Sequence, residues 1–217
     1  MDFFVVARNL PYLADGFVLT LESAAVSILG GTIVGLLLGL ARAGRVPVLR
    51  QAAMLYIELI RGTPLLVVLL VVYLAVPALT GERLGPVPSA VIGFIVFVAA
   101  YIAEDLRSGL ASVPVGQIEA GLASGLSSPQ VMRFVVLPQA LRRMIPALFN
   151  QFVRLIKFTS VASVIGATEL TGAVLEVNAR EVKPLELLAF LALAYFVACY
   201  ALSLLGRWLD RRFAIVS

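Results

Sequence analysis

The amino-acid sequence predicts an all-α, polytopic membrane protein with about five transmembrane helices and one short cytoplasmic helix. Three observations support this prediction. Of the 217 residues, 61% are hydrophobic and 14% are charged, whereas roughly a quarter are charged in an ordinary globular chain. The mean hydropathy is +1.01, and the apolar residues form runs of about 20, the length that crosses a bilayer as a helix. Basic residues follow alternate runs.

The apolar runs define the expected spans. No stretch between them is long enough to form a separate domain, so we expect residues 1–217 to be a single transmembrane domain. The connection between the third and fourth runs, residues 104–143, is the longest polar segment. The expected spans are 17–41, 55–79, 88–103, 147–165 and 185–205.

The basic residues predict how the chain crosses the membrane. Short loops rich in arginine and lysine stay in the cytoplasm, which places the amino terminus outside and the carboxyl terminus inside. Because the charges follow the spans, the net charge of +4 does not indicate nucleic acid. On the expected cytoplasmic side lie Arg42, Arg45, Arg50, Arg107, Arg133, Arg142, Arg143, Arg207, Arg211 and Arg212; on the other lie Arg8, Arg83, Arg180 and Lys183, diluted by acidic residues.

The opening segment, MDFFVVARNLPYLADGF, lacks the basic start, compact apolar core and small-residue cleavage site of a signal peptide. We therefore expect it to be retained and to lie along the membrane surface. The sequence also has no histidine and a single cysteine, Cys199, in the last expected span. We expect no disulfide within the chain, no metal site and no catalytic residue, and we expect Cys199 to pack as a small apolar residue.

A stripe of glycines runs through the first expected span, in the phrase GGTIVGLLLGL. Gly31, Gly35 and Gly39 recur every four residues and therefore share one helix face. Such a stripe lets another helix backbone approach closely. The sequence leaves open whether the partner is a helix of the same chain or of a second subunit.

A short helix is predicted at residues 116–128, within the phrase PVGQIEAGLASGLSSP between two prolines. Ile118, Leu122 and Leu126 form an apolar ridge, and most other side chains are small. Two internal glycines cost about 1 kcal/mol each relative to alanine. The helix either docks against another protein or packs on the ends of its own spans.

The same stretch resembles the cytoplasmic motif of the permease subunits of ATP-binding cassette importers. That motif reads E-A-A, three residues, G, nine residues, I, one residue, L-P. At the matching positions this sequence has Glu119, Ala120, Gly121, Gly125, Val135, Leu137 and Pro138. Gly121 replaces alanine and Val135 replaces isoleucine, and both keep the size class. The resemblance implies a coupling helix that docks on an ATPase, oriented by Glu119, with Ala120, Gly121 and Gly125 allowing close contact.

Four longer phrases extend the resemblance to the polar amino acid permeases of the histidine, glutamine and glutamate type. They are DGFVLTLESAAVSILGGTIVGLLLGLAR, YIELIRGTPLLVVLLVVY, AYIAEDLRSGLASVPVGQIEAG and VVLPQALRRMIPALFNQFVRLIKFTSVASVIGATEL. The resemblance implies a bacterial inner-membrane subunit that pairs with a copy of itself or a sister subunit. It also implies a cytoplasmic ATPase dimer, which would hold ATP and magnesium, and an extracytoplasmic solute-binding protein. No cofactor is expected in this chain.

Polar side chains at membrane depth are costly and therefore mark candidate positions of a substrate pathway. They are Glu58, Arg61, Thr63, Glu104, Arg154, Lys157, Thr159 and Ser160. The phrase RGTP is expected to break a helix. The break either lines a cavity or is a structural kink at which Arg61 reaches to the cytoplasmic surface, and Glu58 and Arg61 are also spaced to pair with each other. The polar stripe from Lys157 faces a pore or a partner helix. Arg154 and Lys157 would attract the carboxylate of any amino acid.

Phe158 replaces an acidic or amide residue usual in the family, which would alter specificity if that position touches substrate.

Two other classes of function are weighed against an importer subunit. The sequence has no G-x-x-x-x-G-K-[ST] phosphate loop, so the energy comes from a partner or an ion gradient. A self-sufficient ion-driven transporter would need a closed path from five spans, which no internal repeat supports. An intramembrane enzyme would need an activated nucleophile or a carboxylate pair, and only the boundary pair Glu104 and Asp105 is present. The sequence favours the importer subunit, without enzyme activity of its own.

Overall fold

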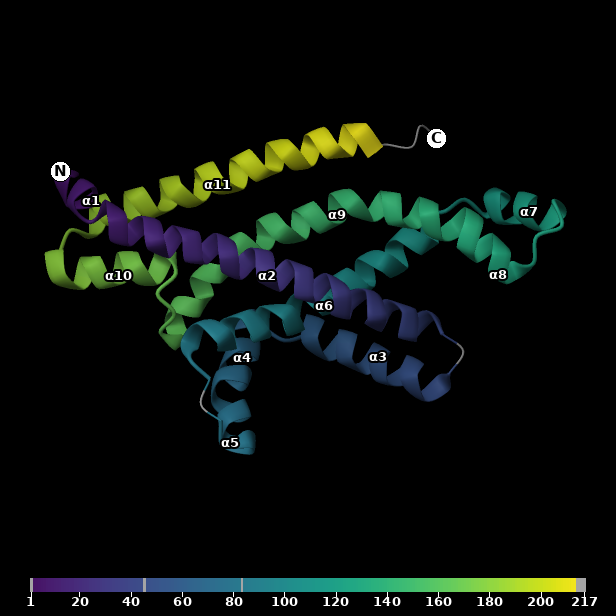
Figure 1. The fold of residues 1–217 in the computed structure, drawn as a ribbon, viewed down its shortest axis with the longest axis horizontal. Helices are drawn as coiled ribbons and strands as arrows, with labels where there is room; N and C mark the ends of the chain where they lie inside the picture. The colour runs from purple at the N-terminus through teal and green to yellow at the C-terminus, as the bar shows by residue number, and fades with distance from the viewer. Residues whose placement is uncertain (1, 45, 83, 214–217) are drawn as a thin grey trace.

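The computed structural model describes residues 2–44, 46–82 and 84–213, and every regular element in these ranges is helical (Figure 1). Four helices are long and apolar enough to cross a membrane, and a bent pair makes a fifth. The all-α class with about five spans is therefore confirmed. Arg45 and Arg83, two residues of the topology prediction, lie outside the described ranges. The long helices are α2 (Leu10–Ala43), α6 (Pro86–Ala111), the continuous segment Ser128–Ile165, and α11 (Pro184–Phe213).

Shorter helices fill the rest of the chain. Two π-helical turns lie within longer helical segments, and a 3₁₀ turn ends the fourth span. The elements are α1 (Phe4–Arg8), α3 (Pro47–Arg61), α4 (Leu65–Leu70), a π-helical turn (Val71–Ala75), α5 (Val76–Thr80), α7 (Val115–Ala123), α8 (Ser128–Val131), a second π-helical turn (Met132–Val136), α9 (Leu137–Phe158), the 3₁₀ helix (Thr159–Ile165) and α10 (Leu170–Glu181).

The second expected span, 55–79, is not one straight helix. Its first residues belong to α3, which meets the segment Leu65–Thr80 at an angle of 111°. The break falls on RGTP, as the sequence predicted. The Gly62 N–H closes α3 on the Glu58 carbonyl at 2.9 Å, and Pro64 adopts an extended conformation before α4 begins. A proline disfavours helical backbone at the residue before it, which explains why α3 cannot continue.

The fourth helix begins well before the expected residue 147. It starts after Ser127, whose backbone N–H donates to the Gln130 side chain at 2.8 Å in a capping box. The expected connection over 104–143 is itself mostly helical, because α6 and the fourth helix both extend into it. Only the segment that contains α7 remains between them. Similarly, α2 begins at Leu10, so part of the opening segment belongs to the first long helix.

One face of α2 consists of small residues and packs along α6 (Figure 1). A β-carbon added at Gly31 would lie 2.1 Å from Val98 Cγ1, and one added at Gly35 would lie 2.7 Å from the Ala99 carbonyl oxygen. Gly39 is similarly close to α6. Bilayer lipid is as apolar as leucine, so helices associate there through close van der Waals packing. The glycine stripe is thus a packing seam within this chain.

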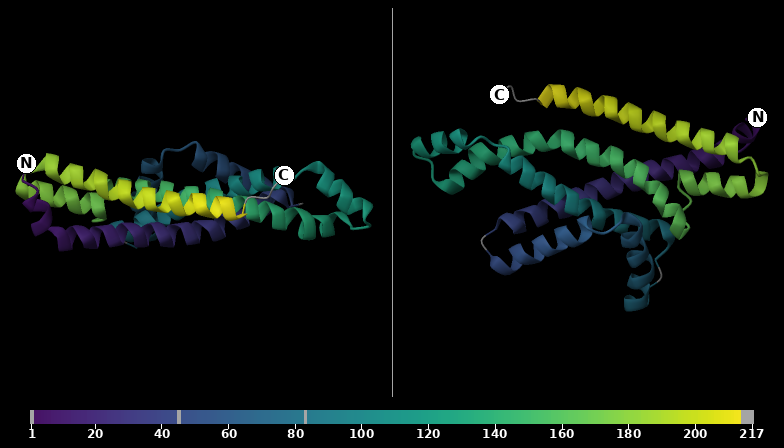
Figure 2. Two further views of the ribbon diagram at one scale, coloured as in Figure 1. Left: turned by 90° about the horizontal axis from the view of Figure 1, so that it is seen from above. Right: turned by 180° about the vertical axis from the view of Figure 1, so that it is seen from behind.

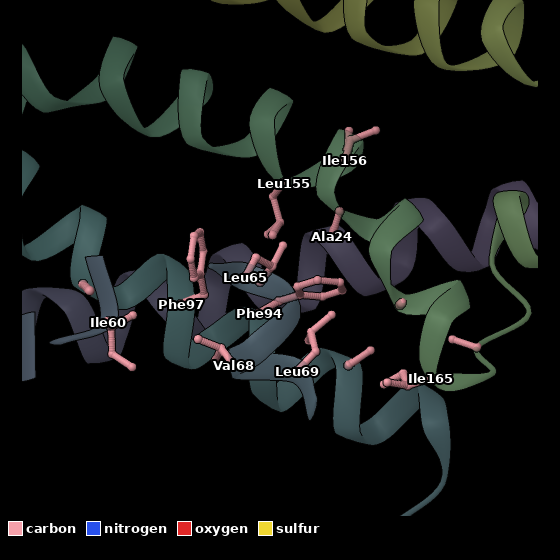
Figure 3. Close-up of a cluster of buried hydrophobic side chains, with 14 residues drawn as sticks. Ala24, Ile60, Leu65, Val68, Leu69, Phe94, Phe97, Leu155, Ile156 and Ile165 are labelled. Atoms are coloured by element: carbon pink, nitrogen blue, oxygen red, sulfur yellow. The ribbon is translucent and has the colours of Figure 1, made fainter. Parts of the chain in front are cut away.

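The largest buried cluster joins four helices around α6 (Figure 3). Phe94 and Phe97 project from α6 among Leu65 and Leu69 of α4 and Leu155 of α9. This cluster fixes α4 against the bundle directly after the sharp bend. Seen from above, the molecule is a flat layer of long helices (Figure 2). α1, α10 and the start of α11 lie at one end and α7 and α8 at the other (Figure 1).

Candidate functional site

The short helix predicted at 116–128 is α7, and it ends earlier than predicted. Gly125 has a left-handed backbone, with φ of +85°, and lies beyond the helix end. The Gly125 N–H donates to the Leu122 carbonyl at 3.0 Å, and the Leu126 N–H donates to the Gly121 carbonyl at 3.2 Å. This is the Schellman arrangement that terminates helices. Gly125 is therefore a cap and not an internal glycine, and the following proline starts α8 and does not end α7.

The inner face of α7 packs on its own chain. Ile118 and Leu126 contact a small buried cluster that includes Val131. A β-carbon at Gly121 would lie 3.0 Å from Val131 Cγ2, so the missing side chain allows α7 to approach the start of the fourth helix. The predicted ridge holds for Ile118 and Leu126, whereas Leu122 is 45% exposed. Gly121 thus serves packing inside the chain.

The outer face of α7 carries little side-chain bulk. Gly116, Glu119 and Ala120 are exposed, and a β-carbon at Gly116 would meet no atom within 4 Å. Within the described residues, the Glu119 carboxylate has no hydrogen bond or ion pair. Leu137, half-buried, and Pro138, exposed, begin α9. The outer face of α7 thus carries small side chains and one negative charge, which suits close contact with another protein.

A network of ion pairs surrounds Glu104, near the α7 end of α6. Its carboxylate accepts from Arg42 Nη1 of α2 at 2.7 Å and from Arg107 Nε at 2.7 Å. Arg61 Nη1, at the end of α3, lies 3.5 Å away. The Glu104 side chain is only 16% exposed, so one carboxylate neutralises part of the charge of three arginines and joins three helices.

Tyr101 extends this network by one turn of α6. The guanidinium groups of Arg61 and Arg154 lie 5.9 and 5.6 Å from its ring centroid, within cation–π range. Beside it, Gln151 of α9 donates to Asp105 at 2.8 Å. The structure thus brings three of the predicted pathway residues together, two arginines around Tyr101 and the glutamate one turn away.

The other predicted pathway residues do not join this cluster. Glu58 is exposed and makes no ion pair with Arg61 in the part of the chain that the structure describes. The hydroxyls of Thr63, Thr159 and Ser160 each donate, at 2.7 Å, to a backbone carbonyl three or four residues earlier in the chain. Lys157 instead lines a groove of about 380 Å³ between α9 and α11. Glu58 and Thr63 belong to the second span, and Lys157, Thr159 and Ser160 belong to the fourth. Together these positions form no single polar site.

Two residues discussed in the sequence analysis, Phe158 at the end of α9 and Cys199 of α11, lie in aromatic surroundings. The ring of Phe158 packs edge-on against Phe97, with 5.9 Å between centroids. It therefore closes the apolar side of the Tyr101 cluster. Cys199 is half-buried in the groove that Lys157 lines, and its Sγ lies 4.0 Å from the Val153 carbonyl oxygen.

Sequence reasoning missed a buried carboxylate, Glu169, at the opposite end of the molecule. It caps α10 by accepting from the Thr171 and Gly172 backbone N–H groups, both at 3.0 Å, and it also accepts from Tyr195 of α11 at 2.8 Å and Thr20 of α2 at 3.3 Å. Burial raises the pKa of this carboxyl above 4.5, against the effect of its donors. The only sequence signal was an acidic residue placed to cap a helix.

Comparison with known proteins assigns this arrangement to a family. The model of the binding-protein-dependent transport system inner membrane components matches residues 4–215. The probable glutamine ABC transporter permease protein GlnP of Bacillus subtilis (strain 168) is 41% identical over 210 residues, 94% of this chain and 95% of that protein. The glutamine transport system permease protein GlnP of Escherichia coli (strain K12) is 38% identical over 216 residues, 99% of each chain.

A third relative and two solved structures agree. The L-cystine transport system permease protein TcyB of Bacillus subtilis (strain 168) is 39% identical over 203 residues, 93% of this chain and 86% of that one. A crystal structure of an amino acid ABC transporter with histidines superposes with a TM-score of 0.94 at 31% identity, covering 98% of this chain and 99% of the other. An inward-facing form of the MetNI methionine ABC transporter, at 23% identity and a TM-score of 0.78 over 96% and 99% of the chains, shares the fold.

A matching family model over nearly the whole chain, and relatives of similar length, leave one assignment. The chain belongs to the inner membrane components of binding-protein-dependent transport systems, as a multi-pass permease subunit of the ATP-binding cassette type.

Proposed function

We propose that this subunit forms the membrane pathway of an importer for a polar amino acid, driven by ATP hydrolysis in a partner ATPase. Two relatives reported above are named as a glutamine permease or a probable glutamine permease, and a third as an L-cystine permease, which makes glutamine the first substrate to test. The observation that carries the proposal is α7, because its inner face is held by its own chain while its outer face is open. The ATP and magnesium would be held by the partner, and this chain holds no cofactor.

In this proposal the coupling residues divide into three groups. Glu119 and Ala120 contact the ATPase directly, because both are exposed on α7. Gly121 and Gly125 shape the helix from within, one by close packing and the other by capping. Leu137 and Pro138, also in the coupling motif, start α9 and join α7 to the fourth span.

The proposed substrate pathway runs past the cluster at Tyr101. Arg61 and Arg154 supply positive charge for the substrate carboxylate, and Lys157 supplies it on the adjacent face of α9. Glu104 holds Arg61 in place through their ion pair. We assign supporting polar roles to Glu58, Thr63, Thr159 and Ser160 along the same two spans.

We also propose that two permease subunits, identical or homologous, pair with an ATPase dimer and receive substrate from an extracytoplasmic binding protein. We infer that the amino terminus lies outside and the carboxyl terminus in the cytoplasm, because Arg42, Arg50 and Arg107 lie together near the end of α6 that leads into α7, and basic segments stay in the cytoplasm. Single cysteines at Ala120 and Ala179, in a Cys199→Ser background, test this orientation. A membrane-impermeant thiol reagent added outside should label only position 179; labelling of position 120 alone contradicts the orientation.

The coupling test compares two alanine-to-arginine changes in the full chain co-expressed with its candidate ATPase. Ala120→Arg places a bulky cation on the outer face of α7, and Ala179→Arg places the same group on exposed α10 at the opposite end. We expect Ala120→Arg to abolish co-purification and glutamine-stimulated ATP hydrolysis in lipid discs, and Ala179→Arg to preserve both. Equal behaviour of the two variants contradicts docking through α7. Transport by the purified chain without an ATPase contradicts the whole proposal.

A further inference from the structure

A basic pocket lies where α2 ends, α3 begins and α6 approaches α7. Its volume is about 280 Å³, and three arginines line it: Arg42, Arg50 and Arg107. Ala43 and Met54 supply part of the apolar wall. Of the described residues that line the pocket, none is acidic. The space is several times the roughly 30 Å³ that a water molecule occupies in the liquid.

The positive charge of this pocket exceeds what the chain itself neutralises. Arg42 and Arg107 each give part of their guanidinium to Glu104, which also faces Arg61 at 3.5 Å. A guanidinium carries five N–H donors, so both arginines keep donors for another anion. Arg50 has no ion pair or side-chain hydrogen bond among the described residues. In the described structure, the one carboxylate that pairs with these arginines is Glu104, which leaves an excess of positive charge in the pocket.

The surroundings of the pocket are apolar and exposed. Leu40 of α2 is 55% exposed, and Val46, Val48 and Leu49, directly before Arg50, are 54%, 74% and 56% exposed. A soluble anion gains nothing from such neighbours. An anion with attached acyl chains does, because the chains can cover this apolar surface while the charged group enters the pocket. Basic pockets between transmembrane helices, at the level of the membrane surface, suit lipid head groups.

We propose that this pocket binds the phosphodiester head group of an anionic phospholipid in the leaflet at the α7 end of the bundle. Arg50 and the unused donors of Arg42 and Arg107 hold the phosphate oxygens, and the acyl chains lie along the apolar residues before Arg50. The bound lipid joins the ends of α2, α3 and α6 through a shared anion. This inference does not depend on the proposed substrate or on the proposed partners.

Native mass spectrometry of the full chain in detergent, titrated with phosphatidylglycerol, tests the site. Arg50→Gln removes the arginine without a partner and keeps the Glu104 network; we expect about fivefold weaker binding, equivalent to about 1 kcal/mol for one basic residue. Arg142→Gln, an exposed arginine at the same end outside the pocket, should leave binding unchanged. Ala43→Glu, a negative charge on the pocket wall, should weaken binding more than Arg50→Gln.

Two further binding experiments distinguish a lipid head group from a soluble phosphate ion. Phosphatidylcholine with the same acyl chains should bind more weakly than phosphatidylglycerol, and inorganic phosphate should not displace the lipid. Equal binding of both lipids, or equal affinity of the unaltered chain, Arg50→Gln and Ala43→Glu, overturns the proposal. Displacement by inorganic phosphate overturns the lipid as ligand, because the pocket would then be a site for soluble anions.

Discussion

Small residues line both one face of α2 and the outer face of α7, yet only the first set is covered by the chain. On α2, the space left by Gly31 and Gly35 is filled by Val98 and Ala99 of α6. On α7, the space beside Gly116 is empty to 4 Å. Both regions look alike in sequence, because each carries several closely spaced glycines. The difference teaches that a small-residue pattern predicts close approach, and that only the fold decides whether the approaching surface is internal.

The largest effect is expected where the chain itself occupies the space. In Gly35→Val the new β-carbon would lie 2.7 Å from the Ala99 carbonyl oxygen, which cannot move without displacing α6. Overpacking should lower the free energy of unfolding by about 3 kcal/mol. Unfolding in mixed micelles with a denaturing detergent measures it. Leu37→Val is the control, because Leu37 is 62% exposed on the other face of α2. Equal stability of the two variants would show that close packing of α2 on α6 does not limit the side chain at position 35.

The next effect is expected at Glu169, which ties the small face of α2 to α10 and α11. Glu169→Gln replaces one carboxylate oxygen by an amide NH2 group, which cannot accept a hydrogen bond. Buried donors therefore lose their partner, at a cost of about 2 kcal/mol in the free energy of unfolding. The same micelle titration measures this loss. Exposed Glu82→Gln is the matched control.

The pH dependence of that loss sharpens the test. The pKa of Glu169 is raised in the folded state, so the stability linked to its proton is fully present below pH 4.5 and is lost as pH rises through the raised value. The advantage of the unaltered chain over Glu169→Gln should therefore shrink with rising pH. An advantage that grows with pH would show that the carboxylate form is the stabilised one.

A smaller, local effect is expected at the end of α7. Gly125→Ala forces a β-carbon into the left-handed region, at a cost of about 1 kcal/mol, and Gly125→Asn should cost less because asparagine tolerates that conformation. Hydrogen exchange should show weaker protection of α7 amides in the alanine variant and no change in α2. Equal protection in all three chains would mean that the glycine cap does not stabilise α7.

The smallest effect on stability is expected on the open face of α7. Gly116→Ala adds a methyl group that meets no atom, so the unfolding free energy should change by no more than about 0.5 kcal/mol. Gly116→Arg should leave hydrogen exchange of α7 similarly unchanged but prevent co-purification with the ATPase. If instead it destabilises the chain and leaves co-purification intact, the open face has been misidentified.

The hydropathy of the sequence was sufficient to predict the class of fold, and the glycine and proline of RGTP were sufficient to predict a break there. The angle of 111° at that break was not predictable, because it depends on Leu65 and Leu69 packing against Phe94. The role of Gly125 was missed for a related reason. A glycine within a helix and a glycine that caps one share the same letter, and the hydrogen bond from Leu126 to Gly121 distinguishes them.

The candidate site was predictable in its parts but not in its connections. Arg61, Glu104 and Arg154 were identified one by one, as charges at membrane depth. Their common neighbour Tyr101 was not, because an aromatic residue in an apolar span carries no distinguishing signal. The predicted pair of Glu58 and Arg61 is absent from the described structure, since Arg61 turns to Glu104 instead. Contacts between residues far apart in sequence decided both outcomes.

The two faces of α2 differ in volume and hardly at all in polarity. Glycine and serine lie on the side of α6, and residues such as Leu29, Ile33 and Leu37 lie on the exposed side. In water a helix is oriented by the contrast between its apolar and its charged face. In a bilayer the lipid and the neighbouring helices are both apolar, so this contrast is lost. The rotation of α2 about its own axis is therefore fixed by the shape of its small-residue face, which fits the side chains of α6.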